Sequence, residues 1–112
     1  MKRIHLDDLK EVGISHNKDI KKKVFLENGL IPKLTTFAMA TFKPGQKVET
    51  HKHETMFEIF YIQSGRAEFV IQGEKLLVQE GDCVVVEPGE EHSQENPNKE
   101  DVTWLYFGVA TD

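Results

Sequence analysis

Residues 45–65 read GQKVETHKHETMFEIFYIQSG, two strand-like runs joined by a short polar segment. His51 and His53 are two positions apart in it, and residues i and i+2 of a strand point to the same face. Glu58 opens the second run, on the face that continues through Phe60 and Ile62. A buried lone carboxylate is costly. A glutamate at the head of an inward face therefore indicates a cation beside it.

A third histidine, His92, follows the turn Pro88-Gly89, which we expect to fold a new strand back over the first pair. Imidazole nitrogens with one carboxylate suit the first-row metals Fe, Mn, Zn, Ni, Co and Cu, whereas Mg²⁺ and Ca²⁺ prefer oxygen ligands. A His-x-His pair alone is equally typical of two exposed surface histidines. The larger set, with glycines where a sheet must turn, favours a metal site.

The rest of the chain predicts an all-β fold. Glycine and proline interrupt it at short intervals, and turns every 8–12 residues are typical of a sandwich or barrel. Strands are predicted at 34–42, 57–62, 67–71, 76–78, 83–86 and 102–109. Over 4–12 we expect a strand followed by a turn of helix. The lysines at 21–23 indicate a solvated strand end, with an anion-binding patch as the alternative.

Composition excludes several classes of protein. The 112 residues make one domain, and a net charge of −5 disfavours nucleic acid and anionic membranes as partners. No apolar stretch approaches 18 residues, and no signal peptide is evident at the start. The single cysteine, Cys83, rules out a disulfide within the chain and is expected to be buried and inert. We expect a cytoplasmic protein.

The spacing of these residues resembles that of the cupins. Their first motif reads Gly, five residues, His-x-His, three or four residues, Glu, six residues, Gly. Their second reads Gly, five residues, Pro-x-Gly, two residues, His, three residues, Asn. The matching residues are Gly45, His51, His53, Glu58 and Gly65, then Gly81, Gly89, His92 and Asn96. The one departure is Glu87 in the usual proline position, with Pro88 beside it.

The resemblance implies an antiparallel jelly-roll β-barrel over residues 31–112, with residues 1–30 as an N-terminal strand or arm packed on the barrel or on a partner. It also implies one divalent transition metal per chain, held by His51, His53, Glu58 and His92. Small cupins commonly pair, and the segments 4–6 and 22–26 lack obvious partners within one small barrel. We therefore expect a homodimer.

The metal would act on a small molecule. Four ligands leave two positions of an octahedral ion open, and three neutral imidazoles with one carboxylate leave about +1 on a divalent centre. This favours a metal-dependent enzyme of the dioxygenase, isomerase or decarboxylase type, acting on a small oxygen-rich metabolite. The alternatives are a non-catalytic module that binds or senses a small ligand, and a purely structural metal.

Residues beside the site are harder to assign. Candidates to line a cavity or contact a substrate are Met39, Thr41, Phe60, Ile62, Arg66, Gln94 and Tyr106, each with plain barrel core or surface as its alternative. Trp104 is expected in the core, and His16 in a loop or capping segment, with a role in the site as the alternative. The pattern does not place a general acid or base inside, although Glu68 and Tyr106 are candidates.

Overall fold

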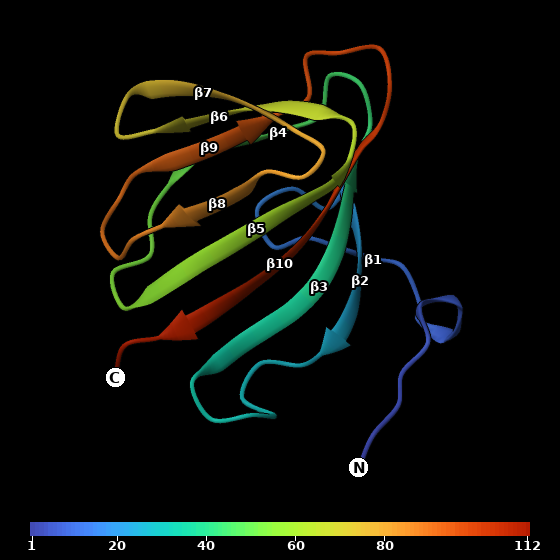
Figure 1. The fold of residues 1–112 in the computed structure, drawn as a ribbon. Coiled ribbons are helices and arrows are strands. Elements are labelled where there is room, and N and C mark those ends of the chain that lie inside the picture. Colours follow the sequence, from blue (N-terminus) through green and yellow to red (C-terminus); the bar gives the residue numbers. More distant parts are fainter.

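The computed structural model describes all 112 residues and contains ten strands in two antiparallel sheets (Figure 1). The strands are β1 (Val12–Gly13), β2 (Lys21–Leu26), β3 (Leu34–Phe42), β4 (Lys47–His51), β5 (Met56–Ser64), β6 (Arg66–Ile71), β7 (Glu74–Gln79), β8 (Cys83–Val86), β9 (His92–Glu95) and β10 (Val102–Ala110). One sheet has the order β1-β2-β3-β10-β5-β8, and the other β4-β9-β6-β7. This jelly-roll barrel confirms the predicted fold class.

The six strands predicted with bounds, β3, β5, β6, β7, β8 and β10, begin and end within two residues of those bounds. The prediction for residues 4–12 is wrong, because a short 3-10 turn (Leu6–Asp8) comes first and the two-residue β1 follows. The His5 ring explains the turn, since its Nδ1 accepts a hydrogen bond from the Asp7 backbone N–H at 3.1 Å. The first strand therefore begins only after this turn, at Val12.

The N-terminal strands belong to the barrel itself. β2 pairs antiparallel with β3, and Lys22 lies opposite Ala40. The expectation that residues 22–26 lack partners within one barrel is therefore wrong. Ile14 and Ile20, on either side of the β1–β2 loop, are buried in the core, so the hairpin packs as part of the fold.

Alternation along the strands gives the six-stranded sheet an inner and an outer face. Ala40 of β3, Phe60 of β5 and Trp104 of β10 are buried on the inner face. The Phe60 ring meets Phe69 of the opposite sheet edge-on, with ring centroids 5.1 Å apart. Figure 1 shows β8, β5, β10 and β3 in succession in this sheet. The core therefore fills the space between the two sheets.

Cys83 lies on the outer face, and the prediction that its thiol is buried is wrong. In β8 the side chains of Val84 and Val86 are buried, so those of Cys83 and Val85 point outward. The run looks uniformly apolar in sequence, and only the pairing with β5 decides which half of it faces the core.

Gly65 is the glycine whose lack of a side chain matters most for the fold. It joins β5 to β6 with a φ of +83°, in the left-handed region that favours glycine. A Cβ there would lie 2.8 Å from the Val102 Cα and would also collide with the Asp101 carbonyl oxygen. The tight turn thus lets the start of β10 pass beside it.

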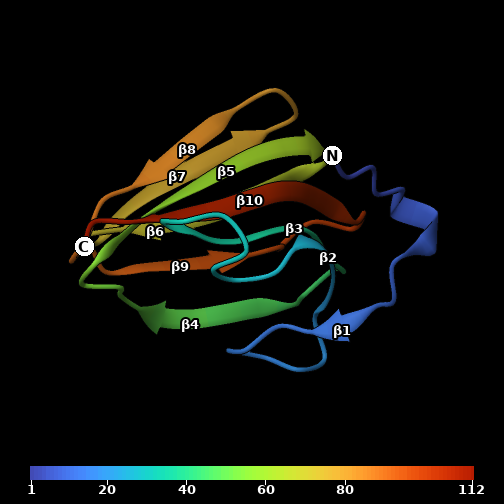
Figure 2. The same cartoon turned by 90° about the horizontal axis from the view of Figure 1, so that it is seen from below.

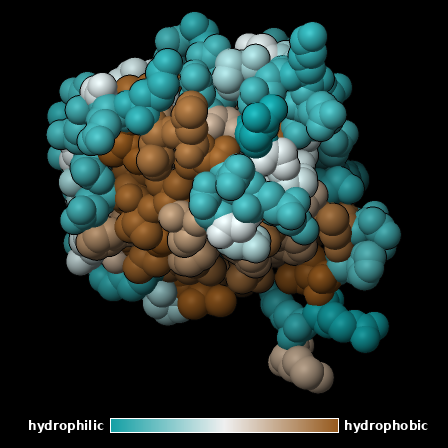
Figure 3. All heavy atoms as spheres, turned by 45° about the horizontal axis from the view of Figure 1, so that its top comes forward, coloured by the Kyte–Doolittle hydropathy of each residue, from teal (hydrophilic) through white to brown (hydrophobic).

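Large hydrophobic side chains also reach the surface, among them Tyr61 and Val85, which are 46% and 52% exposed. Figure 3 shows one face on which hydrophobic residues gather into a broad area bordered by hydrophilic ones. None of the structure's helical segments has the length and apolarity needed to cross a membrane.

Candidate metal centre

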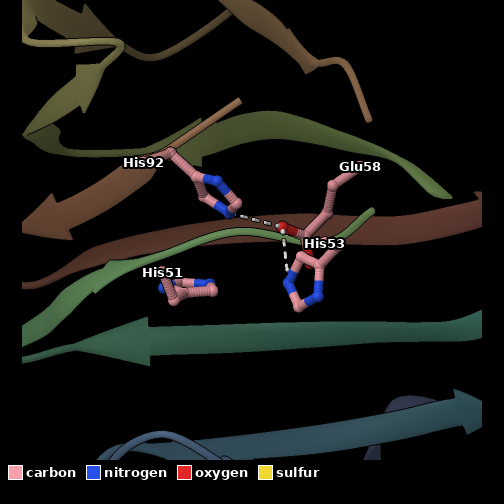
Figure 4. A group of neighbouring side chains, drawn as sticks. All are labelled: His51, His53, Glu58 and His92. Carbon is pink, nitrogen blue, oxygen red and sulfur yellow. Dashed lines mark hydrogen bonds and ion pairs between the residues drawn. The ribbon is translucent and has the colours of Figure 1, made fainter. Parts of the chain in front are cut away.

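Four side chains from both sheets converge at one end of the barrel (Figure 4). His51 ends β4 and is paired with His92, the first residue of β9, while His53 follows β4 by two residues. Glu58 reaches the same point from β5 in the other sheet. We name His51, His53, Glu58 and His92 the His/Glu cluster. One donor atom from each lies within 4.8 Å of the others.

The Glu58 carboxylate lies at the centre of the cluster. Its Oε1 is 3.1 Å from the His92 Nε2 and 3.9 Å from the His53 Nε2. The carboxylate is mostly buried, and the His92 side chain is fully buried. Three imidazoles and one carboxylate at these separations are the donor set that divalent first-row transition metals take. The residues therefore fit a metal ion.

Two of the histidines are held by the backbone in one tautomer. The Nδ1 of His51 lies 2.9 Å from the Glu49 carbonyl oxygen, and the Nδ1 of His92 lies 2.9 Å from the Glu90 carbonyl oxygen. A carbonyl can only accept, so each Nδ1 carries the proton and donates. The Nε2 lone pair of His51 is left free for a cation. In metal sites, hydrogen bonds of this kind fix the tautomer and the orientation of the ligating ring.

The surroundings affect the histidines differently. Burial lowers the pKa of His51 and of His53, and the neighbouring imidazoles lower both further. Burial also lowers the pKa of His92, but hydrogen bonds to Glu58 and to the Glu90 carbonyl outweigh it and the pKa is raised. A metal ion bound by the His92 Nε2 and Glu58 would take the place of the hydrogen bond between them.

A cavity of about 280 Å³ opens beside the cluster. Its apolar wall includes Phe42, Phe60 and Trp104, and its polar groups include Gln94 and the Tyr106 hydroxyl. Burial and the nearby Glu58 charge raise the pKa of Tyr106 to about 12. The phenol is therefore protonated at neutral pH and is available as a hydrogen-bond donor.

The structure brings three of the seven candidate lining residues to the cavity: Phe60, Gln94 and Tyr106. Gly108, which also lines it, keeps the space open, because a Cβ there would lie 2.8 Å from the Met56 Sδ. Trp104 is buried in the core as expected, at 2% exposed, and lines the cavity as well.

The other four candidates lie elsewhere. Met39 and Thr41 alternate with the buried Ala40 and so point to the outer face, where the Thr41 Oγ1 lies 3.0 Å from the Thr103 Oγ1. Ile62 is fully buried and belongs to the core cluster. Arg66 is exposed at the start of β6, in the other sheet.

Of the two candidate acids, only Tyr106 lies at the cavity. Glu68 lies in β6, where its carboxylate pairs with the Lys75 ammonium at 3.5 Å. Because Glu68 lies between the buried Ala67 and Phe69, its side chain points out of the barrel.

The structure confirms the loop predicted at His16 and places the ring of this residue against the cluster. It lies in the β1–β2 loop, with its ring centroid 4.0 Å from that of His51 and 6.0 Å from that of His53. Burial lowers its pKa, and the charge of a protonated His51 lowers it further. No spacing motif signals this residue, because its position depends on how the hairpin packs against β4.

Comparison with known proteins gives a family. The model of the family described as Cupin domain matches residues 38–108. The oxalate-binding protein of Thermotoga maritima is 38% identical over 73 residues, which are 65% of this chain and 60% of that protein. The chain thus spans about 60% of the length of this curated relative. His16 and Lys22 lie outside the segment that matches the family.

Solved structures agree with this fold. A crystal structure described as a predicted oxalate decarboxylase from Thermotoga maritima has a TM-score of 0.89 at 27% identity, covering 97% of this chain and 99% of that one. A Cupin 2 conserved barrel domain protein from Salinispora arenicola has a TM-score of 0.75 at 21% identity, covering 97% and 88%. The second likeness concerns the fold alone.

Proposed function

The chain belongs to the cupin domain family, and on this premise we propose that it binds one divalent transition metal at the His/Glu cluster and presents it to a small oxyanion. The observation that carries the proposal is the geometry of the cluster: four donor atoms within 4.8 Å of one another, beside a cavity of about 280 Å³. A metal held there would act as a Lewis acid towards an oxygen ligand.

Charge supports an anionic ligand. Three neutral imidazoles and one carboxylate leave about +1 on a divalent ion, and attraction to an anion is stronger in a cavity of low dielectric constant than in water. The name of the oxalate-binding relative supports oxalate or a similar chelating acid. We therefore propose a binding protein for small chelating oxyanions.

A metal-dependent enzyme of the dioxygenase, isomerase or decarboxylase type is the second candidate. The Tyr106 hydroxyl favours it, because a protonated phenol at the cavity is placed to donate a hydrogen bond to a ligand beside Glu58. The relative structure described as a predicted oxalate decarboxylase supports the same reaction class. Formate release from oxalate by the Mn(II)-loaded protein would favour catalysis, and oxalate recovered unchanged would favour binding.

The test of oxyanion binding uses Co(II). The protein is purified without chelator or nickel resin, loaded with Co(II) and titrated with oxalate while the d–d absorption is followed. A saturable change in the spectrum is expected. An unchanged spectrum up to millimolar oxalate, with tetrahedral Co(II) intensity throughout, would contradict the proposal and favour a closed structural site.

We also propose a homodimer that forms through the outer face of the six-stranded sheet. Residues paired directly across strands share a face, and the pairs on this side are apolar, such as Leu105 with Met39 and Leu105 with Tyr61. We name this set the outer apolar face: Phe37, Met39, Ile59, Tyr61, Cys83, Val85, Leu105 and Phe107. Exposed apolar surfaces of this breadth mark interaction sites.

A second copy is the occupant that charge favours. The eight residues of the outer apolar face carry no charge, although the chain has a net charge of −5, and the charged side chains on this side of the sheet are Lys21 and Lys23 of β2, opposite Thr41 and Met39. Two copies that meet over these eight residues in an isologous pair would bury no charged side chain at the centre of the interface. A strongly charged partner would gain no complementary contact with these eight residues.

We propose a cytoplasmic location as well. Cys83 is the only cysteine and its thiol is exposed, a state that a reducing compartment preserves. Cell fractionation with an antibody against the chain tests the location, and recovery outside the cytoplasm would contradict it.

A further inference from the structure

One wall of the cavity comes from the N-terminal hairpin, outside the segment that matches the family. Ile14, Ser15 and His16 line the cavity from the β1–β2 loop, and Lys22 lines it from β2. Figure 2 shows β1 and its following loop beside β4, the strand that carries His51. The hairpin is therefore placed to contact a molecule that the cluster holds.

The loop is tied in place at several points. The Ile14 N–H donates to the Ile20 carbonyl oxygen at 3.0 Å, and both side chains are buried. The Asn17 amide donates to the Lys47 carbonyl oxygen of β4 at 3.2 Å. The Gln46 amide donates to the Asp19 carbonyl oxygen at 3.1 Å. These bonds close the loop across His16 and tie the segment that follows it to residues 46 and 47 at the start of β4.

The His16 ring faces the cluster without being one of its donors. It stacks on His51 with an interplanar angle of 32°, and the four donor atoms that lie within 4.8 Å of one another do not include its nitrogens. None of the chain's hydrogen bonds involves the His16 ring, although an imidazole always carries at least one N–H donor. A polar group without a protein partner at the wall of a cavity is available to a ligand.

We propose that His16 is a specificity-determining residue, whose ring N–H hydrogen-bonds an outward oxygen of a chelating dicarboxylate bound at the His/Glu cluster. The inference rests on the proposed function. A dicarboxylate such as oxalate that binds a metal through one oxygen of each carboxylate presents its other two oxygens away from the metal. A monocarboxylate such as acetate that binds through both oxygens presents none. His16 thus selects diacids, and the Lys22 side chain on the same wall adds a positive charge.

The test separates the hydrogen bond from the stacking of the rings. His16→Phe keeps an aromatic ring against His51 and removes the donor, whereas His16→Gln keeps a donor and removes the ring. Co(II) affinity is measured for each variant, followed by oxalate and acetate affinity of the Co(II)-loaded protein from the d–d spectrum. His5→Phe is the matched control, because His5 is a mostly exposed histidine whose ring contacts Asp7.

The expected result is a selective loss. His16→Phe should bind Co(II) as the wild-type protein does but lose about 10- to 100-fold in oxalate affinity, the range for a hydrogen bond to a charged group. Its acetate affinity should be unchanged. His16→Gln should recover most of the oxalate affinity, and His5→Phe should behave as the wild type throughout. Near-ultraviolet circular dichroism confirms that each variant is folded.

Three results would overturn the inference. Wild-type oxalate affinity in His16→Phe would show that the ring N–H contacts no ligand. A loss of Co(II) affinity, or an equal loss for oxalate and acetate, would show that His16 binds the metal or only supports His51. If the wild-type protein binds Co(II) but shows no response to oxalate, the proposed function itself fails and the inference fails with it.

Discussion

The two faces of the six-stranded sheet are both rich in apolar side chains, but only one is covered within the chain. On the inner face, Ala40 and Trp104 are 1% and 2% exposed, whereas Tyr61 and Val85 on the outer face are 46% and 52% exposed. An antiparallel sheet with one face in water usually alternates apolar and polar residues. This difference between the faces is what the proposed dimer accounts for, because a second copy would cover the outer face.

The few polar groups of the sheet also separate by face. Glu58 and the Tyr106 hydroxyl lie on the inner face, at the end where the histidines of the other sheet converge. On the outer face, β3, β10, β5 and β8 carry no ionisable group except Cys83 and Tyr61, and β2 adds Lys21 and Lys23. Under the two proposals, binding chemistry would lie inside the barrel and association on its outside.

The largest expected effect concerns the inner face, where a double variant removes two of the proposed metal ligands. The double variant His51→Ala, His53→Ala removes two donors. It should lower metal affinity by much more than about 100-fold, because losing only the hydrogen-bond partner of a metal ligand already costs about 10- to 100-fold. Metal content is measured by inductively coupled plasma mass spectrometry after dialysis. About one metal per chain in the double variant would show that the ligands lie elsewhere.

The next effect tests how firmly the inner face is packed. Phe42 is 2% exposed, and its ring centroid is 4.5 Å from that of Trp104. Phe42→Ala should lower the free energy of unfolding by about 3–5 kcal/mol, measured by urea denaturation of the metal-free protein. Leu77→Ala, at a position 71% exposed, is the control and should cost less than about 1 kcal/mol. Equal losses at the two positions would contradict the assigned core.

A third variant breaks the outer face alone. Leu105→Glu places a charge between Met39 and Tyr61 on the outer apolar face. We expect the wild-type protein to have the mass of a dimer by light scattering at micromolar concentration and the variant that of a monomer, because each interface would hold two unpaired carboxylates. Metal content should stay near the wild-type value. A monomeric wild type would refute the dimer.

The smallest expected effect is the pH dependence of the metal-free protein. Burial lowers the pKa values of His16, His51 and His53 from about 6.5, so below pH 6.5 the unfolded chain binds more protons at these residues than the folded one. Stability should therefore fall as the pH falls from 7 to 5. His92 acts in the opposite sense, since its raised pKa adds stability below pH 6.5 that is lost as the pH rises through its folded value.

Urea midpoints at pH 7 and pH 5 measure this dependence. Three groups lower stability on acidification and one raises it, so the wild-type midpoint should decrease, and the decrease should be smaller in the His51→Ala, His53→Ala variant. A midpoint that rises towards pH 5 would show that His92 outweighs the other three. Bound metal should also dissociate in this range, because ligating imidazoles must be neutral.

The two apolar faces also explain what the sequence predicted and what it did not. Strand positions followed from turn residues and β-branched runs, and the motif spacing brought the four cluster residues together in advance. The sequence did not predict which face of the sheet each side chain points to, because a shift of one position moves a side chain to the other face. With both faces apolar, alternation does not distinguish Met39 from Ala40 or Cys83 from Val84, and Met39 and Cys83 were misplaced.

The contact of His16 with the cluster did not follow from the sequence, for a different reason. His16 precedes His51 by a long stretch of chain, and its position depends on the burial of Ile14 and Ile20 and on the bond from Asn17 to β4. No local pattern contains these contacts. Lys22 is similar, since only its pairing with Ala40 shows that it lies on the inner side.

The hydrogen bonds that hold His51 and His92 have a consequence for how the chain can change over time. Each ring donates to the carbonyl oxygen two residues earlier, at positions 49 and 90. A carbonyl oxygen is present whatever side chain a residue carries, so mutation at either position leaves the acceptor in place. The orientation of these two rings of the His/Glu cluster therefore does not depend on which side chains residues 49 and 90 carry. Side chains at positions 49 and 90 can therefore change while the Nε2 atoms of His51 and His92 keep their direction towards the cluster.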